Sequence, residues 1–429
     1  MTSGNSSDEP ICLDNDEAQE KLGTIADAFL LHDRGIIRRA DDSVLQNLDS
    51  GPFFFRRSRG YAPVPVFIKG QGPDILAVGP ELKNTICLLK NDRAFLSPHI
   101  GDLENLQAFD FFKETIATMQ NVLECEPDFI AHDMHPGYLS TQWARKQSRK
   151  LIPVQHHHAH LVAVMAEHKV DGQAIGLIMD GTGFGEDGTI WGGEILAGDA
   201  SGFSRLGHFE PVPLPGGDAA IKAPWRTAVS YLRHAVGEEA VLELLPGSFE
   251  NLAVQPVLEI LRKKINSPLT SSCGRLFDAV AALTGLWTEA RYEAQAAIEL
   301  MALTTHEEVR QAKAWDGVSG SMTLPVSPFI TAAVESVTRG VSPQEISARF
   351  HRTLIDVLAS AAMVASRETG LRQVVLAGGV FQNEILMIGL VEALTALGLH
   401  PLRPEQTPAN DGGIALGQAL IARAVCGRQ

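Results

Sequence analysis

Two stretches of this chain follow the same plan of apolar strand, polar turn and second apolar strand, and they start about a hundred residues apart. The first covers residues 75–89, with a polar turn at 81–85. The second covers residues 175–197, with a glycine-rich turn at 180–185. Beyond residue 65, short apolar strands alternate with helical segments along the chain. This pattern predicts an α/β protein whose core is duplicated.

A duplicated hairpin of this kind is typical of actin-like folds. Each ribonuclease-H-like half opens with such a hairpin and presents its turn to bound phosphate. We therefore predict two actin-like halves, at roughly residues 63–170 and 171–429. Residues 1–62 are too few to close a core alone. They are predicted to form an incomplete α/β unit with a helix over 18–31 and a strand over 36–44.

The composition excludes several classes of protein. Hydrophobic residues make up 45% of the chain, yet no apolar run approaches the roughly eighteen residues of a membrane span. The N-terminus also lacks a signal-peptide pattern, so we expect a cytoplasmic protein with no membrane partner. A formal net charge of −15 disfavours nucleic acid as a partner. The five cysteines include no C-x-x-C pair, which indicates reduced thiols rather than disulfides or a structural zinc site.

Four of the fourteen histidines fall within the five positions 156–160, directly before an apolar helical segment. On a helix, His156 and His160 stand one turn apart on one face, which is the spacing at which two neutral imidazoles hold one metal ion. His158 would point elsewhere. The alternative is a polar cluster that caps the helix. The density of histidines favours a metal site, which needs a carboxylate ligand from another part of the chain.

Asp411 is one candidate for that carboxylate. It lies on a glycine-flanked turn before the helical segment 414–425, where it either caps the helix or supplies a hard anionic ligand. Asp180 is another, because it ends the strand 175–179 and can hold a cation. The glycines that follow it let backbone N–H groups approach a phosphate, although glycine-rich hairpin turns are also common without a ligand.

Two further segments carry candidate ligand contacts. Residues 374–377 form a buried strand that runs into Gly378 and Gly379 and then a helix, whose N-terminus can meet an anion or a nucleotide. A tight turn that needs glycine is an equally good explanation. Asp278 lies one turn inside a helix, where it either accepts hydrogen bonds from ribose hydroxyls or is simply solvated. Cys273 has no assignable base, which argues against a nucleophile.

The motifs of the chain resemble the C-terminal part of the HypF-type carbamoyltransferases of nickel–iron hydrogenase maturation. The resemblance covers nearly the whole chain from about residue 60 onward. The matching segments are ELKNT (81–85), LSPHIGDLEN (96–105), HDMHPGY (132–138), QHHHAH (155–160), DGTGFG (180–185), LPGGD (214–218), APWR (223–226), SSCGRLFDA (271–279), GGVFQN (378–383) and NDGG (410–413). This module looks like the tRNA threonylcarbamoyl-transferase domain, which has an actin-like fold.

Residues 1–62 resemble the end of the YrdC-like domain that precedes this module in the family, with Ser3 and Asn5 in its S-x-N motif. Family members normally begin with an acylphosphatase-like domain, zinc-finger C-x-x-C pairs and a complete YrdC-like domain, which makes carbamoyl-adenylate from carbamoyl phosphate and ATP. The sequence shows only a remnant of the last. We therefore expect the adenylate-forming domain to lie in another chain or in missing upstream sequence.

The resemblance implies a divalent metal, iron or zinc, held by His156, His160 and Asp411, with Asp180 as a further ligand or partner. It also implies an ATP- or AMP-type nucleotide, bound as carbamoyl-adenylate. The residues implied to contact the nucleotide are Asp180, Gly181, Thr182, Gly183, Phe184, Gly274, Asp278, Gly378, Gly379 and Asn383, with Ser3 and Asn5 in the YrdC-like remnant. The chain has Ala294 where the family often has glycine, so a methyl group is expected to crowd a backbone contact to the nucleotide.

The implied function is carbamoyl transfer from carbamoyl-adenylate to the C-terminal cysteine thiol of a HypE-type partner, on the route to the cyanide ligand of the hydrogenase. Without an adenylate-forming domain, the chain is expected to carry only the transfer half-reaction. One alternative is carbamoylation of a small-molecule hydroxyl, and another is an inactive nucleotide-binding scaffold.

Overall fold

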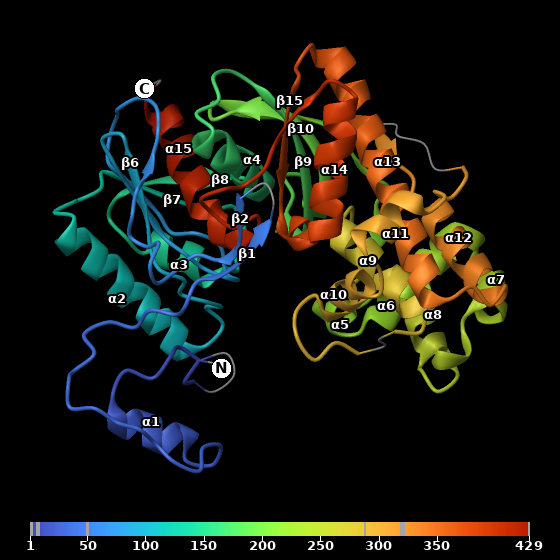
Figure 1. Ribbon diagram of the computed structural model, residues 1–429, viewed down its shortest axis with the longest axis horizontal. Helices are drawn as coiled ribbons and strands as arrows, with labels where there is room; N and C mark the ends of the chain where they lie inside the picture. The colour runs from blue at the N-terminus through green and yellow to red at the C-terminus, as the bar shows by residue number, and fades with distance from the viewer. Residues whose placement is uncertain (1–2, 6–8, 49–50, 287–288, 318–321, 428–429) are drawn as a thin grey trace. The chain divides into compact units, whose positions relative to one another are not determined.

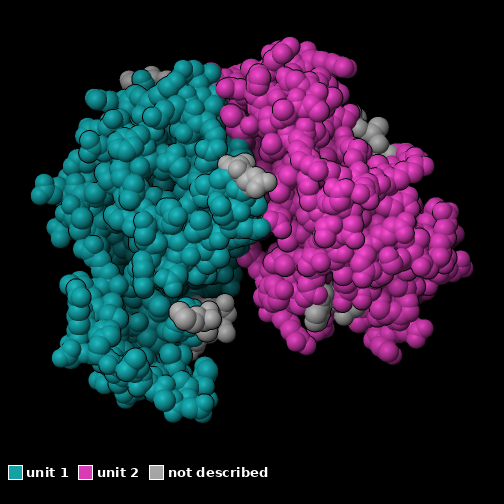
Figure 2. Space-filling model, in the orientation of Figure 1, with its two compact units in different colours: residues 1–171, 199–202, 403–429 teal, residues 172–198, 203–402 magenta. Residues whose placement is uncertain are grey.

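A computed structural model describes residues 3–5, 9–48, 51–286, 289–317 and 322–427. The chain forms two compact units, which Figure 2 colours separately. Unit 1 contains residues 1–171, 199–202 and 403–429, and unit 2 contains residues 172–198 and 203–402. The C-terminal segment 403–429 thus packs with the first unit, a return of the chain that the continuous predicted halves did not include.

Unit 1 is built on a six-stranded sheet with the order β3-β6-β5-β4-β7-β8. The pairs β3–β6, β6–β5 and β5–β4 are antiparallel, whereas β7 and β8 extend the sheet in parallel from β4. The predicted first hairpin is present as β4 and β5. The strands are β3 Val66–Phe67, β4 Ile75–Ala77, β5 Cys87–Lys90, β6 Arg93–Leu96, β7 Phe129–Asp133 and β8 Lys150–Val154.

Helices cover both faces of this sheet (Figure 1). Side chains alternate between the faces along each strand, so that Ile75 and Ala77 join one apolar cluster and Leu76 joins the other. The first cluster includes side chains of α4 and α15, and the second includes side chains of α2 and α3. These helices are α2 Leu106–Val122, α3 Leu139–Arg145, α4 His156–Glu167 and α15 Ile414–Cys426.

Unit 2 repeats this plan with the strand order β11-β10-β9-β15-β16. Strands β9 and β10 are antiparallel, and β15 and β16 continue in parallel from β9. The match to β6-β5-β4-β7-β8 in unit 1 confirms the predicted duplication and the actin-like fold class. The strands are β9 Ala174–Phe184, β10 Ile190–Asp199, β11 Gly202–Phe209, β15 Gln373–Ala377 and β16 His400–Leu402, with the short β12 Val212–Pro213, β13 Leu269–Thr270 and β14 Thr323–Leu324.

The longest helix of unit 2, α13 Pro343–Thr369, shows why its ends lie where they do. Ser342 caps the first turn by accepting a hydrogen bond from the Glu345 N–H, and Gly370 ends the helix in the left-handed conformation. No helix among the described residues is long and apolar enough to cross a bilayer. The other helices are α5 Asp218–Lys222, α6 Pro224–Val236, α7 Glu238–Leu244, α8 Val254–Arg262, α9 Cys273–Leu283, α10 Gln295–Ala302, α11 His306–Gln311, α12 Ser327–Thr338 and α14 Glu384–Ala396.

The N-terminal part of unit 1 contains α1 Asn15–Leu22 and a hairpin of β1 Val44–Leu48 and β2 Gly51–Arg56. The predicted helix over 18–31 is wrong in its bounds, because Asp14 caps a helix that starts earlier and ends before Gly23. The predicted strand over 36–44 is also wrong. Pairing in the hairpin begins only at Val44, because β2 ends opposite that residue and offers no partner further upstream.

Candidate functional site

The histidine cluster of unit 1 lies where β8 ends and α4 begins. Gln155 caps the helix, because its side-chain oxygen accepts a 2.8 Å hydrogen bond from the His158 backbone N–H. All four histidines of the cluster are buried. Buried polar rings need partners, so the groups that each ring faces decide its role.

Two of these histidines meet Asp411. The rings of His156 and His160, one helical turn apart, have centroids 5.2 Å from each other. Asp411 Oδ1 lies 3.6 Å from His156 Nε2 and 3.7 Å from His160 Nε2. The packing of α15 against α4 brings the preceding turn, η3 Asp411–Gly413, to the histidines. The structure thus brings together three of the predicted metal ligands, which we call the His-His-Asp group.

Asp411 is not a helix cap, which corrects one of its two predicted roles. Asp411 lies inside the short turn η3, and the helix α15 that follows has no side-chain cap. The cap of η3 is Asn410, whose side-chain oxygen accepts a 3.0 Å hydrogen bond from the Gly412 N–H. The Asn410 amide nitrogen in turn donates to the Phe55 carbonyl at 3.1 Å. The turn is therefore held by Asn410, and the Asp411 carboxylate is directed to the histidines.

Asp133 fixes the orientation of His156. This carboxylate ends β7, is fully buried, and has its Oδ2 2.8 Å from His156 Nδ1. A carboxylate at that distance accepts a hydrogen bond, so Nδ1 carries a proton, and Nε2, the atom that faces Asp411, is the nitrogen left to bind a metal. The Asp133 Oδ1 accepts a 2.8 Å bond from the His135 backbone N–H, which holds the carboxylate in place. Asp133 was not predicted, although an aspartate at the end of an apolar strand in the HDMHPGY motif is a usable signal.

The other two histidines of the cluster have different partners. His158 Nε2 lies 2.7 Å from the Asp199 backbone oxygen, and burial lowers the pKa of this ring, so His158 is a neutral hydrogen-bond donor. His157 Nδ1 lies 3.2 Å from the Gln155 amide nitrogen. As expected from the helical spacing, His158 does not face Asp411 with His156 and His160.

The chemistry of the His-His-Asp group suits a divalent metal. Two imidazole nitrogens and a carboxylate oxygen are common ligands of zinc and of non-haem iron. A carboxylate behind the ligating histidine, as Asp133 lies behind His156, is the usual outer partner of a metal-bound imidazole. The side chain of His156 is fully buried and that of Asp411 is 16% exposed, which shields the group from bulk water.

Asp180, the fourth predicted ligand, belongs to unit 2 and lies within β9. It is 5% exposed, and its Oδ1 accepts a 2.9 Å hydrogen bond from the Gly379 N–H. The prediction of a glycine turn directly after Asp180 is wrong, because residues 181–184 continue the strand and Gly183 pairs with Trp191 of β10. Glycine permits a turn without requiring one, and β10 supplies strand partners as far as Phe184.

The start of α9 lies directly against this part of β9. Ser272 caps α9, and its Oγ lies 2.7 Å from the Asp180 carbonyl oxygen and 2.8 Å from that of Gly181. Gly274 is required for this approach, because a Cβ at that position would lie 2.9 Å from Gly181 Cα. The predicted residues of the DGTGFG and SSCGRLFDA motifs are therefore neighbours within unit 2.

Asp278, one turn further along α9, is buried rather than solvated, which excludes the simpler of its two predicted roles. Its Oδ2 lies 2.9 Å from Arg275 Nε. Burial raises the pKa of Asp278, and the Arg275 guanidinium partly opposes that rise. Cys273 is also buried, and desolvation raises the pKa of its thiol well above the usual range, which agrees with the prediction that it is not a nucleophile.

The predicted strand, double glycine and helix are present as β15, the turn η2 Gly379–Gln382 and α14. Gly378 has a φ of +102°, and a Cβ there would lie 2.3 Å from the Met179 carbonyl oxygen, so glycine is needed for backbone reasons. The N–H of Gly379 is donated to Asp180. Asn383 caps α14 by accepting a 3.0 Å hydrogen bond from the Leu386 N–H.

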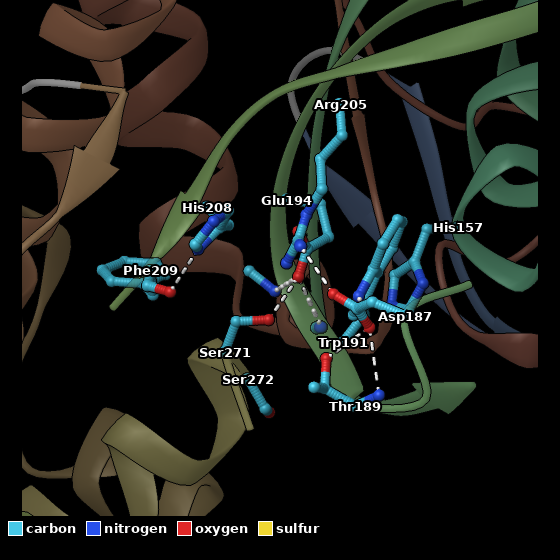
Figure 3. A network of polar contacts seen from close by, with 12 residues as sticks. His157, Asp187, Thr189, Trp191, Glu194, Arg205, His208, Phe209, Ser271 and Ser272 are labelled. Atoms are coloured by element: carbon cyan, nitrogen blue, oxygen red, sulfur yellow. Dashed lines mark hydrogen bonds and ion pairs between the residues drawn. The ribbon is translucent and has the colours of Figure 1, made fainter. Parts of the chain in front are cut away.

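A polar network holds the β9–β10 hairpin of unit 2, as Figure 3 shows. Glu194 on β10 is fully buried and accepts hydrogen bonds from Arg205 Nε at 2.7 Å and from Ser271 Oγ. Arg205 also pairs with Asp187 at 3.1 Å, and its guanidinium lies 4.1 Å from the Trp191 ring centroid. The network joins β10, β11 and the residue before the α9 cap. It was not predicted, because only the folded sheet brings these residues together.

The remaining predicted positions have local partners or strain. Asn5 donates a 2.8 Å hydrogen bond from its side chain to the Glu9 carbonyl, and Ser3 is exposed. Ala294 adopts the left-handed conformation, with φ 57° and ψ 17°, directly before α10. Glycine is favoured in that conformation, which gives the departure at Ala294 a backbone cost.

Three family models match successive parts of the chain. Residues 176–418 match the model described as "Carbamoyltransferase, Kae1-like Domain, second subdomain", and residues 70–167 match "HypF Kae1-like domain". Residues 1–58 match the Sua5/YciO/YrdC model described as "Telomere recombination". The first of these models alone covers more than half of the chain.

Named relatives agree with the models. The chain is 43% identical over 427 residues to carbamoyltransferase HypF of Rhizobium leguminosarum bv. viciae, a match of 99% of this chain and 55% of that protein. It is 36% identical over 359 residues to a HypF homologue of Cupriavidus necator, covering 81% of this chain and 91% of the homologue. A crystal structure of full-length HypF in the phosphate- and nucleotide-bound form superposes with a TM-score of 0.93 and 42% identity, over 99% of this chain and 67% of that one.

The chain spans little more than half of the length of several of these relatives, as the 55% coverage of the Rhizobium protein shows. The agreement nevertheless extends over nearly every residue of the chain, in sequence and in fold. On these grounds the chain belongs to the HypF carbamoyltransferase family.

Proposed function

We propose that this chain carries the transfer half-reaction of the family, in the cytoplasm, during hydrogenase maturation. A carbamoyl group moves from carbamoyl-adenylate to the C-terminal cysteine thiol of a HypE-type partner. The observation that carries the proposal is the His-His-Asp group, in which Asp411 Oδ1 lies 3.6 and 3.7 Å from the Nε2 atoms of His156 and His160.

His156, His160 and Asp411 would hold a divalent ion, iron or zinc, and Asp180 is proposed as a further ligand on the resemblance alone. When bound, such an ion supplies Lewis-acid polarisation of a carbonyl or phosphoryl oxygen. Asp133 keeps the proton of His156 on Nδ1, so that Nε2 stays available as a ligand atom. The burial of both histidines excludes the water that would otherwise compete for the ion.

The nucleotide is proposed to bind through the elements that carry residues 180–184, Gly274, Asp278, Gly378, Gly379 and Asn383. Close packing of α9 against β9 and the turn after β15 are the structural support for this assignment within unit 2. Ser3 and Asn5, in the YrdC-like segment, are also proposed to contact nucleotide.

The transfer step balances in atoms and electrons with two reactants alone, carbamoyl-adenylate and the acceptor thiol. The thiolate sulfur of the acceptor attacks the carbamoyl carbon, a carbon–sulfur bond forms, the bond from that carbon to the phosphate oxygen breaks, and AMP leaves. The thiol proton passes to solvent. The acceptor brings the nucleophile, which agrees with the buried and unreactive Cys273 of this chain. A separate YrdC-like domain would supply the carbamoyl-adenylate.

The test combines the purified chain with carbamoyl phosphate, ATP, an adenylate-forming YrdC-like protein and a HypE-type acceptor. Mass spectrometry of the acceptor is expected to show a thiocarbamate on the C-terminal cysteine only when all components are present. Absence of carbamoylation in the complete mixture would contradict the proposal. Release of pyrophosphate by the chain alone, with carbamoyl phosphate and ATP, would contradict its restriction to one half-reaction.

A further inference from the structure

A histidine outside the cluster lies in the interior of unit 2, where the proposed mechanism gives it no part. His351 lies within the first half of α13 and is fully buried. Its ring packs near Phe277 of α9, with centroids 5.5 Å apart, and near Phe350, with centroids 5.7 Å apart. An imidazole among aromatic rings must satisfy two nitrogen atoms, so its partners define its protonation state.

The partners of Nδ1 place the proton of His351 on that atom. Nδ1 lies 2.8 Å from the backbone carbonyl oxygen of Ser347 and 3.3 Å from its Oγ. A carbonyl oxygen can only accept, so Nδ1 must donate. The Ser347 hydroxyl donates its own proton to the Leu300 carbonyl and therefore has none to give to the ring. Burial lowers the pKa of His351 to about 4, which keeps the ring neutral at physiological pH.

A neutral ring with its proton on Nδ1 has a lone pair on Nε2, and Asn383 Nδ2 lies 2.8 Å from that atom. Asn383 therefore donates one amide hydrogen to His351. At the other end of the amide, Asn383 Oδ1 accepts the 3.0 Å hydrogen bond from the Leu386 N–H. Both contacts require the same orientation of the carboxamide, with nitrogen toward the ring and oxygen toward the start of α14.

Asn383 lies at the edge of the proposed nucleotide-binding elements. It follows η2, whose first residue donates its N–H to Asp180, and it is only partly buried. With one amide hydrogen used by His351, the second N–H is the donor that the side chain can offer to a ligand. A flipped amide would place its NH2 against the Leu386 N–H and its oxygen against the His351 lone pair, and both contacts would be repulsive.

We infer that His351 is a positioning residue, which acts through Asn383 and makes that side chain present an N–H donor to the nucleotide. The ligand atom recognised at Asn383 is then a hydrogen-bond acceptor, such as a ribose hydroxyl oxygen or a phosphate oxygen. This inference rests on the proposed nucleotide binding. It adds a residue that lies in none of the motifs that carry the family resemblance.

The first test is the nucleotide affinity of matched variants, measured by calorimetry with ATP and the full chain. His351→Phe keeps an aromatic ring but removes the Nε2 acceptor, and a loss of about tenfold in affinity is expected, since one oriented hydrogen bond is given up. Ser347→Ala is the control. It removes a buried hydroxyl from the same site, leaves Nε2 and Asn383 in place, and is expected to keep the wild-type affinity even if its melting temperature falls.

The second test observes the His351–Asn383 pair directly, and its first measurement uses the wild-type chain alone. In the 15N NMR spectrum of the wild-type chain, His351 is expected to show a protonated Nδ1 and an unprotonated Nε2. In Asn383→Asp, the new carboxylate should draw a proton onto Nε2, so that the ring becomes an imidazolium and ATP affinity falls at least as far as in His351→Phe.

Three results would overturn the inference. They are a protonated Nε2 in the wild-type chain, equal ATP affinity in His351→Phe and the wild type, and equal losses in His351→Phe and Ser347→Ala. A wild-type chain that binds no nucleotide would contradict the proposed function instead, and the NMR spectrum would still decide whether His351 orients Asn383.

Discussion

The two units share one sheet plan, yet they present their candidate residues in different ways. In unit 1, three side chains from α4 and η3 converge, and a buried carboxylate behind them orients His156. In unit 2, each candidate side chain pairs with another residue of the same unit. Asp180 is hydrogen-bonded to Gly379, Asp278 forms an ion pair with Arg275, and Asn383 is hydrogen-bonded to His351. Substitutions in unit 1 should therefore change ligand binding first, whereas those in unit 2 should change folding stability as well.

The largest effect is expected when one member of the His-His-Asp group in unit 1 is removed. His160→Ala is expected to abolish stoichiometric metal binding, because a site that has lost one of its two imidazole ligands should not retain a divalent ion against competing buffer. Metal content after dialysis, measured by plasma mass spectrometry, checks this. His158→Ala is the matched control, because His158 is in the same helix but bonds to the Asp199 carbonyl, and it should keep its metal. Unchanged metal in His160→Ala would refute the site.

The ion pair of unit 2 is the corresponding weak point there. Arg275→Met leaves the buried Asp278 without its cation and should lower the free energy of unfolding by about 3 kcal/mol at neutral pH. The pKa of Asp278 is already raised by burial and rises further without Arg275. The folded state then holds the proton to higher pH than the unfolded state, whose pKa is about 4, so the stability of the variant falls as pH rises above that value.

Urea unfolding of the wild type and Arg275→Met at pH 5 and pH 7.5 checks this prediction. The deficit of the variant should be larger at pH 7.5. The double variant Arg275→Met/Asp278→Asn, which carries no buried charge at this position, should recover part of the lost stability. A deficit that is the same at both pH values would show that packing, rather than the stranded carboxylate, causes the loss.

A substitution of Asp133 tests whether a residue that is not itself a metal ligand holds the ligands of unit 1 in position. Asp133→Asn should weaken metal affinity by about ten- to a hundredfold while all three ligands remain, because the proton of His156 loses its anionic partner. Competition with a chelator measures the affinity. Asp199→Asn is a suitable control, since His158 bonds to the backbone oxygen of Asp199 rather than to its side chain. Equal metal affinity in Asp133→Asn and the wild type would show that Asp133 does not support metal binding through His156.

The smallest expected effect concerns the backbone of unit 2. Ala294→Gly should stabilise the chain by up to about 1 kcal/mol, because Ala294 is held in the left-handed conformation before α10. Ala297→Gly, within the regular part of α10, should destabilise it by a similar amount. Thermal unfolding of both variants checks the pair of signs, and a loss of stability in Ala294→Gly would contradict the strain.

The features that could be predicted were those that depend on the spacing of residues along the chain. The duplicated hairpins predicted the actin-like plan, and the helical interval between His156 and His160 predicted that their rings share a face. Asp411, some 250 residues away, was one of two candidate carboxylates on the grounds of its glycine-flanked turn, and the family resemblance then assigned it to these histidines. The structure explains how the contact forms, because α15 packs on α4 and brings the turn that contains Asp411 to the two histidines.

Other features were decided by tertiary contacts that spacing does not reveal. Asp133 lies on β7 and reaches His156 only because β7 and β8 are neighbours in the sheet. The glycines after Asp180 predicted a turn, but this segment continues β9 and pairs with β10. In the sequence, His351 is simply one residue within a long helical segment. Only the folded structure places its ring beside the Asn383 side chain.

The X-ray absorption spectrum of the full chain loaded with zinc or iron would identify the atoms that bind the metal. We expect two imidazole nitrogens and additional oxygen ligands, with nitrogen distances near 2.0–2.1 Å for zinc, and loss of the imidazole signal in a double variant of His156 and His160. A first shell that contains sulfur, or one of water oxygens without imidazole, would contradict the assignment of the His-His-Asp group as the metal site.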